Sequence, residues 1–540
     1  MKISSLTVKR IVVWALVIGL LATMGLAAAA GTAIAAPKYT LTGVASTQVQ
    51  QTGQKLTITV TYKKGTKARA KASVQLQYYN AAKKKWVNEG KAKKTSSAGK
   101  ATFTVKQQTA GKKLKYRFYV KASKTQKKFT VHWVPGSFTI KGSGFGPGVG
   151  MPQYGALQYL KEQPAKTYAD ALAYYYKGAK LESVNRNGRT VKVQVLTPRT
   201  TTTVTGGGFT VTDENGSTLG SFPAGSIALG VRGSKVTVGG TDSAGAAVSA
   251  SASRVTIRWN NDTTTASVAG AEGVYKYGNL QATVINGGVN VVNEVLMNSE
   301  YLYGIEEMPA SWGTTGYGKQ ALKAQAVASR SFTIAKVSRA NGYPGGVDAA
   351  CDCQLRASTA DQNFIGWQKK LKDGAHYQQW IDAVDGTMTA TTVEVLRSSN
   401  PGQIVEAMFY SATGKVANAA TGSSADVVGT AQNLHPNLVS VVDPYSAKAA
   451  PSGVNAWPAG RGSGPRQVVL SQAQLQSLFG LKSSEKVVSV SIGRYPGGLI
   501  KSLTATLHNG RKTSVITKPA QHWMAALGTP SPWVTSISGK

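Results

Sequence analysis

Two basic side chains in an alanine-rich stretch have a spacing that suggests chemistry. Lys323 and Arg330 are seven positions apart in "ALKAQAVASRSF" (321–332), and Val327 lies between them. Positions i, i+4 and i+7 of a helix share one face. The pair therefore predicts either two solvated or ion-paired side chains or a cationic wall of a cleft that binds a carboxylate-bearing ligand.

A second unusual pattern is a run of glycines at every second position from Gly142 to Gly150. Alternate residues of an extended segment face one side, so this spacing leaves that side bare. A polysaccharide or another backbone could approach closely there. The run lacks the Gly-Lys-Ser/Thr ending of a P-loop, which argues against a phosphate cradle. A flexible linker is the alternative, but the specific sequence "VGMPQYGA" that follows does not suit a spacer.

The elements that must position these residues can be read from periodicity. Residues 318–340 predict one long helix near the middle of the chain, and residues 167–176 also have helical spacing. Residues 191–295 are rich in Thr, Val, Gly and Ser, with turn signals at Asn215-Gly216 and Asn286-Gly287. We therefore expect a long meander of strands between the two helices.

Composition limits the partners. The 540 residues carry 62 Lys and Arg against 24 Asp and Glu, a formal charge of +38. An excess of this size indicates an anionic polymer or surface as the partner. The N-terminus, residues 1–35, has a basic start and an apolar run from Ile11 to Ala30, which is typical of a secretory signal peptide. The run is also long enough to serve as an uncleaved membrane anchor. Export makes nucleic acid an improbable partner, and a wall polymer fits better.

Residues 36–135 predict a separate basic domain. The stretch from Pro37 to Pro135 holds 23 Lys and Arg and one acidic residue, Glu89. Alternating runs begin at Lys55, Ser73 and Ala101 and in residues 116–120, which predicts a small antiparallel sandwich similar to bacterial immunoglobulin-like modules. The lysines either make a soluble face or bind an anionic polymer such as teichoic acid, and the one-sided charge favours binding.

The two cysteines, Cys351 and Cys353, exclude a disulfide-rich scaffold. The pair could donate two thiolates to zinc, but the nearest histidine is His376. We expect a disulfide or free thiols, and no metal or other cofactor. A serine hydrolase is not indicated either, because the chain has no Gly-x-Ser-x-Gly elbow.

Several segments together resemble the SpoIID/LytB family. The resemblance runs over residues 138–537, and its motifs are "GSGFGPGVGMPQYGA" (142–156), "YLYGIEEMPASW" (301–312), "ALKAQAVASRSF" (321–332), "DQNFIGW" (361–367) and "GQIVEAMFYSATG" (402–414). It implies lytic cleavage of peptidoglycan glycan strands that have lost their stem peptides. Such a lytic transglycosylase needs one carboxyl group, which first gives and then takes a proton.

The resemblance implies roles for individual residues. The glutamate before Met-Pro, Glu307, would be the acid/base, with a pKa raised by burial and neighbouring charge. Lys323 and Arg330 match basic positions that would hold the lactyl carboxylates of a stripped strand. The substrate contacts carried over from the glycine and "FYSATG" segments are Gln153, Tyr154, Tyr410 and Ser411.

The sequence also departs from the family pattern. Pro147 and Pro152 replace the usual His and Ser of the glycine segment, and both remove polar groups. Residues 313–318 are an insertion, and Lys415 follows "FYSATG" in place of paired glycines. The glycine motif comes before the core of the domain, an order that is acceptable if the C-terminus lies near Phe138.

These observations combine into one expected organisation. We expect an α+β protein with a signal peptide (1–35), a basic immunoglobulin-like β-sandwich (36–135) and a strand-rich SpoIID-like domain with one central helix (136–540). The expected function is that of a secreted, wall-bound lytic transglycosylase. The alternative is a wall-binding protein of the same fold without turnover, which enhances a cell-wall amidase.

Overall fold

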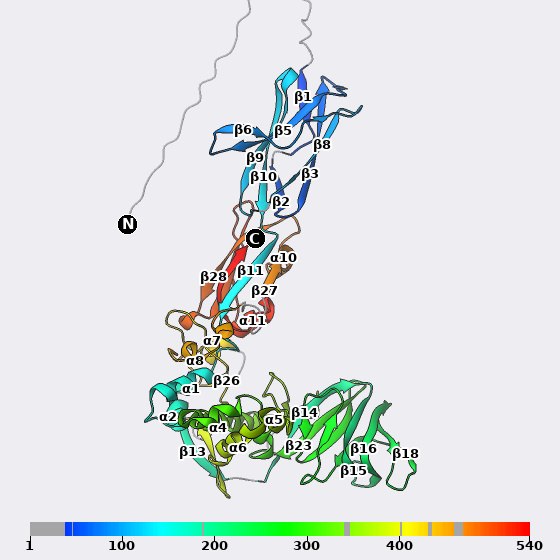
Figure 1. The fold of residues 1–540 in the computed structure, drawn as a ribbon, viewed down its shortest axis with the longest axis vertical. Coiled ribbons are helices and arrows are strands. Elements are labelled where there is room, and N and C mark those ends of the chain that lie inside the picture. The colour runs from blue at the N-terminus through cyan, green and yellow to red at the C-terminus, as the bar shows by residue number, and fades with distance from the viewer. Residues whose placement is uncertain are drawn as a thin grey trace, which may run out of the picture. The chain divides into compact units, whose positions relative to one another are not determined.

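The computed structural model describes residues 38–45, 47–107, 109–185, 188–339, 346–399, 402–429, 435–457 and 468–540 (Figure 1). It is a strand-rich α+β fold with several sheets, as the sequence predicts. The signal-peptide prediction falls outside the described residues. None of the helices among the described residues is both long enough and apolar enough to cross a membrane.

The chain divides into two compact units. The first consists of the described residues before Thr47, together with Thr57–Thr104 and Lys115–Phe129. The second consists of Thr47–Leu56, Val105–Leu114 and the described residues from Thr130 to Lys540.

Two sheets make up the sandwich at the start of the chain. One has the order β1-β3-β4 with β8 paired to β3, and the other the order β2-β10-β9-β5-β6 with β7 paired to β5. The elements are β1 (Tyr39–Thr42), β2 (Thr47–Gln51), β3 (Lys55–Lys64), β4 (Lys67–Ala68), β5 (Ser73–Asn80), β6 (Lys85–Asn88), β7 (Lys93–Lys94), β8 (Lys100–Lys106), β9 (Lys113–Val120), η1 (Lys121–Ser123) and β10 (Thr125–Val134).

The alternation read from the sequence explains how the sheets pack. Along β8, Ala101, Phe103 and Val105 are buried while the residues between them are exposed. The ring of Phe103 lies 5.3 Å from that of Phe118 on the other sheet. The strands predicted in β3, β5, β8 and β9 are confirmed. That this sandwich is immunoglobulin-like stays a prediction.

The remaining elements follow in chain order. The helices are α1 (Gln153–Glu162), α2 (Tyr168–Tyr175), α3 (Glu300–Tyr303), η2 (Ala310–Thr314), α4 (Gly316–Arg339), α5 (Gln368–Asp373), η3 (Gly374–His376), α6 (Tyr377–Asp385), α7 (Ser424–Val427), α8 (Ser446–Ala449), α9 (Ser452–Asn455), α10 (Gln472–Leu478), η4 (Pro496–Gly498) and α11 (Ala520–Leu527).

The strands of this part are β11 (Ser137–Ser143), β12 (Met151–Pro152), β13 (Lys180–Asn185), β14 (Thr190–Arg199), β15 (Thr202–Thr212), β16 (Thr218–Arg232), β17 (Lys235–Thr241), β18 (Ala247–Ala252), β19 (Arg254–Arg258), β20 (Ala266–Val268), β21 (Val274–Tyr275), β22 (Asn279–Ile285), β23 (Gly288–Leu296), β24 (Leu355–Arg356), β25 (Thr392–Arg397), β26 (Phe409–Tyr410), β27 (Val468–Ser471), β28 (Val487–Arg494), β29 (Ile500–Leu507), β30 (Ile516–Thr517) and β31 (Trp533–Gly539).

The predicted meander is confirmed as a sheet with the order β18-β17-β16-β15-β19-β22-β23-β14-β24. Asn286 and Gly287, both with positive φ (49° and 74°), form the two-residue turn between β22 and β23. Such a turn matches the twist of the paired strands, which is why Asn-Gly is favoured there. Residues 215 and 216 likewise lie in the turn between β15 and β16.

Helix α4, the longest described helix, confirms the central helix read from the sequence. It packs against α1, α2, α6 and β25, and Figure 1 shows α1, α2 and α6 near it. Four of its alanines are completely buried, namely Ala321, Ala324, Ala326 and Ala328. Small side chains allow neighbouring elements to approach on nearly every side, as their number in the sequence predicts.

The order of the motifs is accommodated as expected. Strand β11 lies between β27 and β31 in a three-stranded antiparallel sheet, with Phe138 opposite Gly539. The C-terminal strand therefore runs beside the segment that leads into the glycine run, and the predicted proximity is confirmed.

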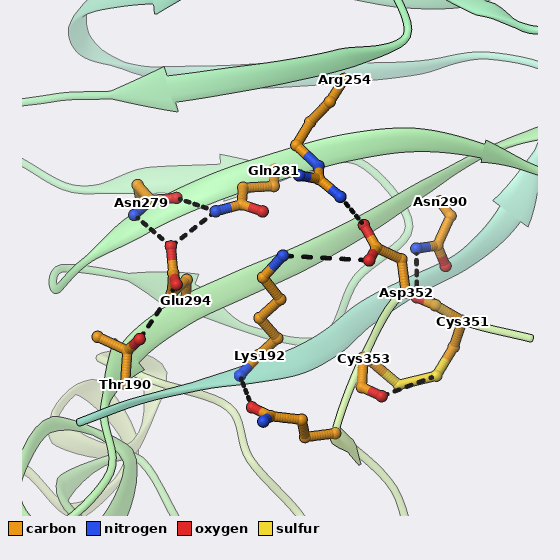
Figure 2. Close-up of polar contacts among 11 residues, drawn as sticks. Thr190, Lys192, Arg254, Asn279, Gln281, Asn290, Glu294, Cys351, Asp352 and Cys353 are labelled. Carbon is orange, nitrogen blue, oxygen red and sulfur yellow. Dashed lines mark hydrogen bonds and ion pairs between the residues drawn. A yellow bond between two sulfur atoms is a disulfide. The ribbon is translucent and has the colours of Figure 1, made fainter. Parts of the chain in front are cut away.

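A cysteine loop fastens the large sheet to the chain that follows it (Figure 2). Cys351 and Cys353 form a disulfide with a Cα–Cα distance of 5.0 Å, and both are buried. The Asp352 carboxylate lies 3.4 Å from Nη2 of Arg254 on β19 and 4.0 Å from Nζ of Lys192 on β14. No cluster of three or more His, Cys, Asp or Glu that could hold a metal occurs in the described part of the chain.

The side of the glycine run that lacks side chains is covered by other parts of the protein's own chain. A Cβ on Gly142 would lie 2.2 Å from the Trp457 ring, one on Gly148 2.7 Å from the Trp533 ring, and one on Gly146 2.6 Å from Cβ of Tyr410. Of the two occupants that the sequence leaves open, backbone and polysaccharide, the protein supplies its own backbone and aromatic rings. The bare side is therefore a surface on which the protein packs its own chain.

The tightest position of this run gives a test. A Cβ at Gly150, where φ is +81°, would lie 1.8 Å from the carbonyl oxygen of Met408. Gly216 has a similar φ of +84°, but no atom lies within 4 Å of its Cβ position. We expect Gly150→Ala to lower the free energy of unfolding by more than about 3 kcal/mol and Gly216→Ala by about 1 kcal/mol. Equal losses in denaturant unfolding would contradict the packing argument.

Candidate active site around Glu307

The segment that carries Glu307 lies between α3 and η2 and is held by a neighbouring strand-like stretch. The amide of Glu306 donates to the carbonyl of Asn363 (2.8 Å), and the amide of Ile365 donates to the carbonyl of Gly304 (2.9 Å). A Cβ on Gly304 would lie 2.6 Å from Cα of Gly366, so only glycine permits this approach. These contacts fix the backbone from which the Glu307 side chain extends.

The Glu307 carboxyl has few partners and little solvent. Its Oε1 accepts one hydrogen bond, from the backbone amide of Asn363 at 2.7 Å. The pKa of Glu307 is raised from 4.5 to about 7. Burial is the main cause, and the nearby Glu306 charge adds to it, while the Asn363 amide and Lys369 act in the opposite direction. A carboxyl with such a pKa holds its proton near neutral pH and can lose it again.

The adjacent carboxylate, Glu306, points to different partners. Its Oε2 lies 2.9 Å from Nζ of Lys369, which is completely buried and also lies 2.8 Å from Asp373. Lys369 further donates to the carbonyl of Met308 at 3.2 Å. Glu306 is therefore an ion-paired anchor, whereas Glu307 forms no ion pair within the described ranges. The two adjacent carboxyl groups therefore have separate partners.

Gln153 connects the glycine segment to the Glu307 segment. It is the first residue of α1 and is buried. Its Nε2 donates to the carbonyl of Glu307 at 2.9 Å and to Oε1 of Gln325 on α4 at 3.4 Å. Gln153 thus positions the backbone of Glu307, so its observed contacts differ from the direct substrate contact that the resemblance implies.

A chain of buried amides continues from this point along α4. Gln325 donates to the Ser329 hydroxyl at 3.0 Å, and Gln362 donates to the Ser329 carbonyl at 3.3 Å. Tyr301 in turn donates to Oε1 of Gln362 at 3.0 Å. Because buried polar groups need partners, this network fixes α4, α3 and the 361–365 stretch relative to one another.

Two aromatic rings adjoin this arrangement. Tyr154 follows Gln153 directly, and its ring lies 5.1 Å from that of Trp312 in η2. Both residues are half-buried, and the Tyr154 amide donates to the carbonyl of Ser411 at 3.0 Å. Partly exposed aromatic rings of this kind offer apolar faces on which a sugar ring can stack.

The two residues carried over from the "FYSATG" segment take different positions. Tyr410 is buried, donates or accepts a hydrogen bond with Thr413 at 2.7 Å, and stacks on Trp533. Its Cβ packs closely against Gly146 of the glycine run, and its side chain is too buried to contact a ligand. Ser411 is half-buried next to Tyr154. The strand pair β12–β26 brings these residues to the start of α1.

The two cations of α4 do not line a common wall near Glu307. Arg330 is completely buried, and its guanidinium donates to the carbonyls of Val384, Thr387 and Glu394 at 3.0–3.3 Å. Lys323 is half-buried, with Nζ 5.6 Å from the centre of the Tyr168 ring. Both side chains lie on the helix face opposite Gln325. The cationic cleft wall is therefore not formed, and Arg330 holds α6 and β25 instead.

Sequence reasoning thus missed several residues of this arrangement. Asn363 and Trp312 lie inside quoted motifs, but neither belongs to a pattern of residues that would predict its role. Lys369 is 63 positions from Glu306, and Gln325 is one polar residue within a buried helix. Only the fold brings them to the Glu307 segment.

The role of Arg330 can be tested by stability. Arg330→Met would remove a buried donor from three carbonyls, although those of Val384 and Thr387 each keep another hydrogen bond. We expect the free energy of unfolding to fall by about 3 kcal/mol. Lys323→Met, on the same helix face but half-buried, should cost less than about 1 kcal/mol. Urea unfolding of both variants measures the difference. A stable Arg330→Met protein with weakened ligand binding would restore the cleft-wall interpretation.

The raised pKa of Glu307 makes a second prediction. A carboxyl whose folded pKa lies above its unfolded value favours folding below pH 4.5 and loses that contribution as the pH rises through about 7. Glutamine stays neutral and can still accept from Asn363. Relative to the natural protein, Glu307→Gln should therefore gain about 3 kcal/mol of stability between pH 4.5 and pH 8.

The control for this measurement is Glu306→Gln, which removes an ion-paired carboxylate and should give no such gain at pH 8. A stability difference between Glu307→Gln and the natural protein that stays constant with pH would show that Glu307 titrates normally.

Comparisons with known proteins bear on the same segment. The family model SpoIID, described as "Stage II sporulation protein", matches residues 285–393. This range contains Glu307, α4, the disulfide and Asn363. The family is associated with peptidoglycan-degrading activity in general and with sporulation, so the match supports a role at the cell wall. No curated protein matches the sequence.

Two solved structures share limited similarity. The "D0-D1 domain of Intimin" is 18% identical over 40% of this chain and 94% of that chain, with a TM-score of 0.15. The BSP domain of a "Biofilm associated protein" is 14% identical over 43% of this chain and 27% of that chain, with a TM-score of 0.12. At such scores the likeness says nothing about this fold.

Proposed function

We propose that this chain, a member of the SpoIID family, cleaves the glycan strands of peptidoglycan by lytic transglycosylation with Glu307 as its single acid/base. The observation that carries the proposal is the half-buried carboxyl of Glu307, whose pKa lies at about 7. A group with this pKa is present in both protonation states near neutral pH, and the reaction requires both.

The reaction needs one carboxyl because its two proton transfers run in sequence. Protonated Glu307 gives its proton to the glycosidic oxygen as the bond to C1 breaks. The carboxylate then takes the proton of the muramoyl 6-hydroxyl as that oxygen bonds to C1. The products are a shortened strand and a 1,6-anhydro sugar, and Glu307 ends protonated as it began. No water is consumed, unlike in glycoside hydrolysis by paired carboxylates.

The surroundings of Glu307 support this assignment. Glu306 is held in an ion pair with Lys369, so we do not assign it the role of a second catalytic carboxylate. The hydrogen bond from Gln153 to the Glu307 backbone keeps the acid in place, and the Tyr154–Trp312 pair offers rings for a sugar. Because Arg330 is buried, it is not placed to bind the lactyl carboxylates of a stripped strand. The preference for strands without stem peptides therefore rests on the family resemblance.

Where the protein acts is part of the same proposal. The apolar N-terminal run and the basic segment 37–135 support export and attachment to anionic wall polymers. The chain would then meet peptidoglycan where it is retained. The other expected role is that of an amidase enhancer, which binds the wall without cleaving it. The following test distinguishes the two roles.

Mass spectrometry of stripped glycan strands after incubation with the protein tests the reaction type. We expect 1,6-anhydromuramic ends from the natural protein and none from Glu307→Gln, with strand binding preserved. Reducing muramic ends would indicate hydrolysis. Strand binding by the natural protein without any anhydro product would identify the non-catalytic role.

Glu306→Gln is the matched control in this experiment. It should still form the anhydro product, because Glu306 does not transfer the proton. Its rate should fall at a lower pH than that of the natural protein, since loss of the neighbouring negative charge lowers the pKa of Glu307.

A further inference from the structure

A cavity of about 1010 Å³ opens in the first unit, at the end of the sandwich where β3 ends and β5 begins. Both sheets contribute to it, as do the 69–72 loop and η1. Its volume is at the upper end of the range typical of ligand pockets. Its lining includes Tyr39, Tyr119, Arg69, Lys71, Lys121 and Gln77.

The tyrosines of the cavity are held rigidly. Tyr39 stacks on Tyr62 with ring centres 5.5 Å apart, and buried Tyr62 donates to the Ser123 hydroxyl at 2.7 Å. Tyr119, from β9, is half-buried and packs against the guanidinium of Arg117 at 4.9 Å. Aromatic rings fixed in this way offer apolar faces on which a sugar can stack.

The amides of the cavity are fixed by a small network. Gln77 donates to Oδ1 of Asn88 at 2.9 Å and accepts from Nε of Arg117 at 2.7 Å. Gln75 donates to the carbonyl of Gly90 at 3.0 Å. Such preorganised polar groups can bond hydroxyl groups at little entropic cost.

The backbone at two of the three cations is fixed by hydrogen bonds. The amide of Arg69 donates to the carbonyl of Tyr62, and the amide of Lys71 donates to the carbonyl of Thr95. The side chains of Arg69, Lys71 and Lys121 are exposed, and no acidic residue is among those that line the cavity. Three positive charges around rings and amides, without a counter-charge, favour a ligand that is both a sugar and an anion.

The geometry points to this cavity as a binding site for an anionic glycan, with a sugar ring against Tyr39 and Tyr119 and its negative group among Arg69, Lys71 and Lys121. The negative group is a phosphate diester or a carboxylate, since either would suit the three cations. In this proposal one pocket retains the protein at the wall. A generally positive surface would instead bind through all of its lysines. It does not depend on Glu307.

Isothermal titration of the full chain tests the site with four probes. Glycosylated glycerol-phosphate oligomers and galacturonic acid oligomers carry both sugar and charge, and they distinguish phosphate from carboxylate. Polyphosphate carries charge alone, and maltohexaose carries sugar alone. We expect one or both of the anionic glycans to bind about tenfold more tightly than either single-property probe.

Substitutions locate the binding. The triple variant R69Q/K71Q/K121Q should weaken anionic glycan binding by about tenfold, while K83Q/K100Q/K128Q removes the same charge from exposed positions outside the cavity and should have less than about threefold effect. Tyr119→Ala should weaken binding of the glycans and leave polyphosphate binding unchanged. Circular dichroism verifies that each variant is folded.

Equal losses in the two triple variants, or equal affinity for polyphosphate and the glycans, would overturn the cavity and leave diffuse charge as the explanation. Formation of anhydro ends is measured separately, so a failed cavity and a failed Glu307 mechanism give different results.

Discussion

The removal of water from one carboxyl group is the constraint on which the rest of this structure depends. Glu307 keeps a single hydrogen bond from a backbone amide, and burial therefore raises its pKa towards neutrality. A buried acid destabilises the fold whenever it ionises, so its surroundings must hold it in place. The Lys369 ion pairs, the Gln153 hydrogen bond and the amide network on α4 provide that support.

Local sequence patterns predicted much of the architecture. The length of α4, the strands from β14 to β23 and the Asn286-Gly287 turn follow from periodicity and from residues that tolerate positive φ. The Cys351–Cys353 disulfide was one of two states left open, and the proximity of Phe138 to the C-terminus followed from the order of the motifs. Apart from the pairing of Phe138 with Gly539, these features depend on contacts between residues that lie close together in the sequence.

Patterns that depend on which face meets which neighbour were less predictable. The spacing of Lys323 and Arg330 correctly placed them on one helix face, but it could not tell that this face packs on α6 and β25. The alternating glycines were correctly interpreted as permitting close approach, yet the approaching groups are Trp533, Trp457 and the Met408 backbone. Partners that lie far apart in sequence, such as Glu306 and Lys369, have no sequence signal at all.

The central claim is that Glu307 is a protonated acid near neutral pH, and an infrared pH titration of the protein with labelled glutamate carboxyls tests it most directly. One carboxylic acid band that is absent from Glu307→Gln should disappear with a midpoint near pH 7. A midpoint near the ordinary value of 4.5 would contradict the claim, because Glu307 would then be ionised wherever the reaction needs its proton.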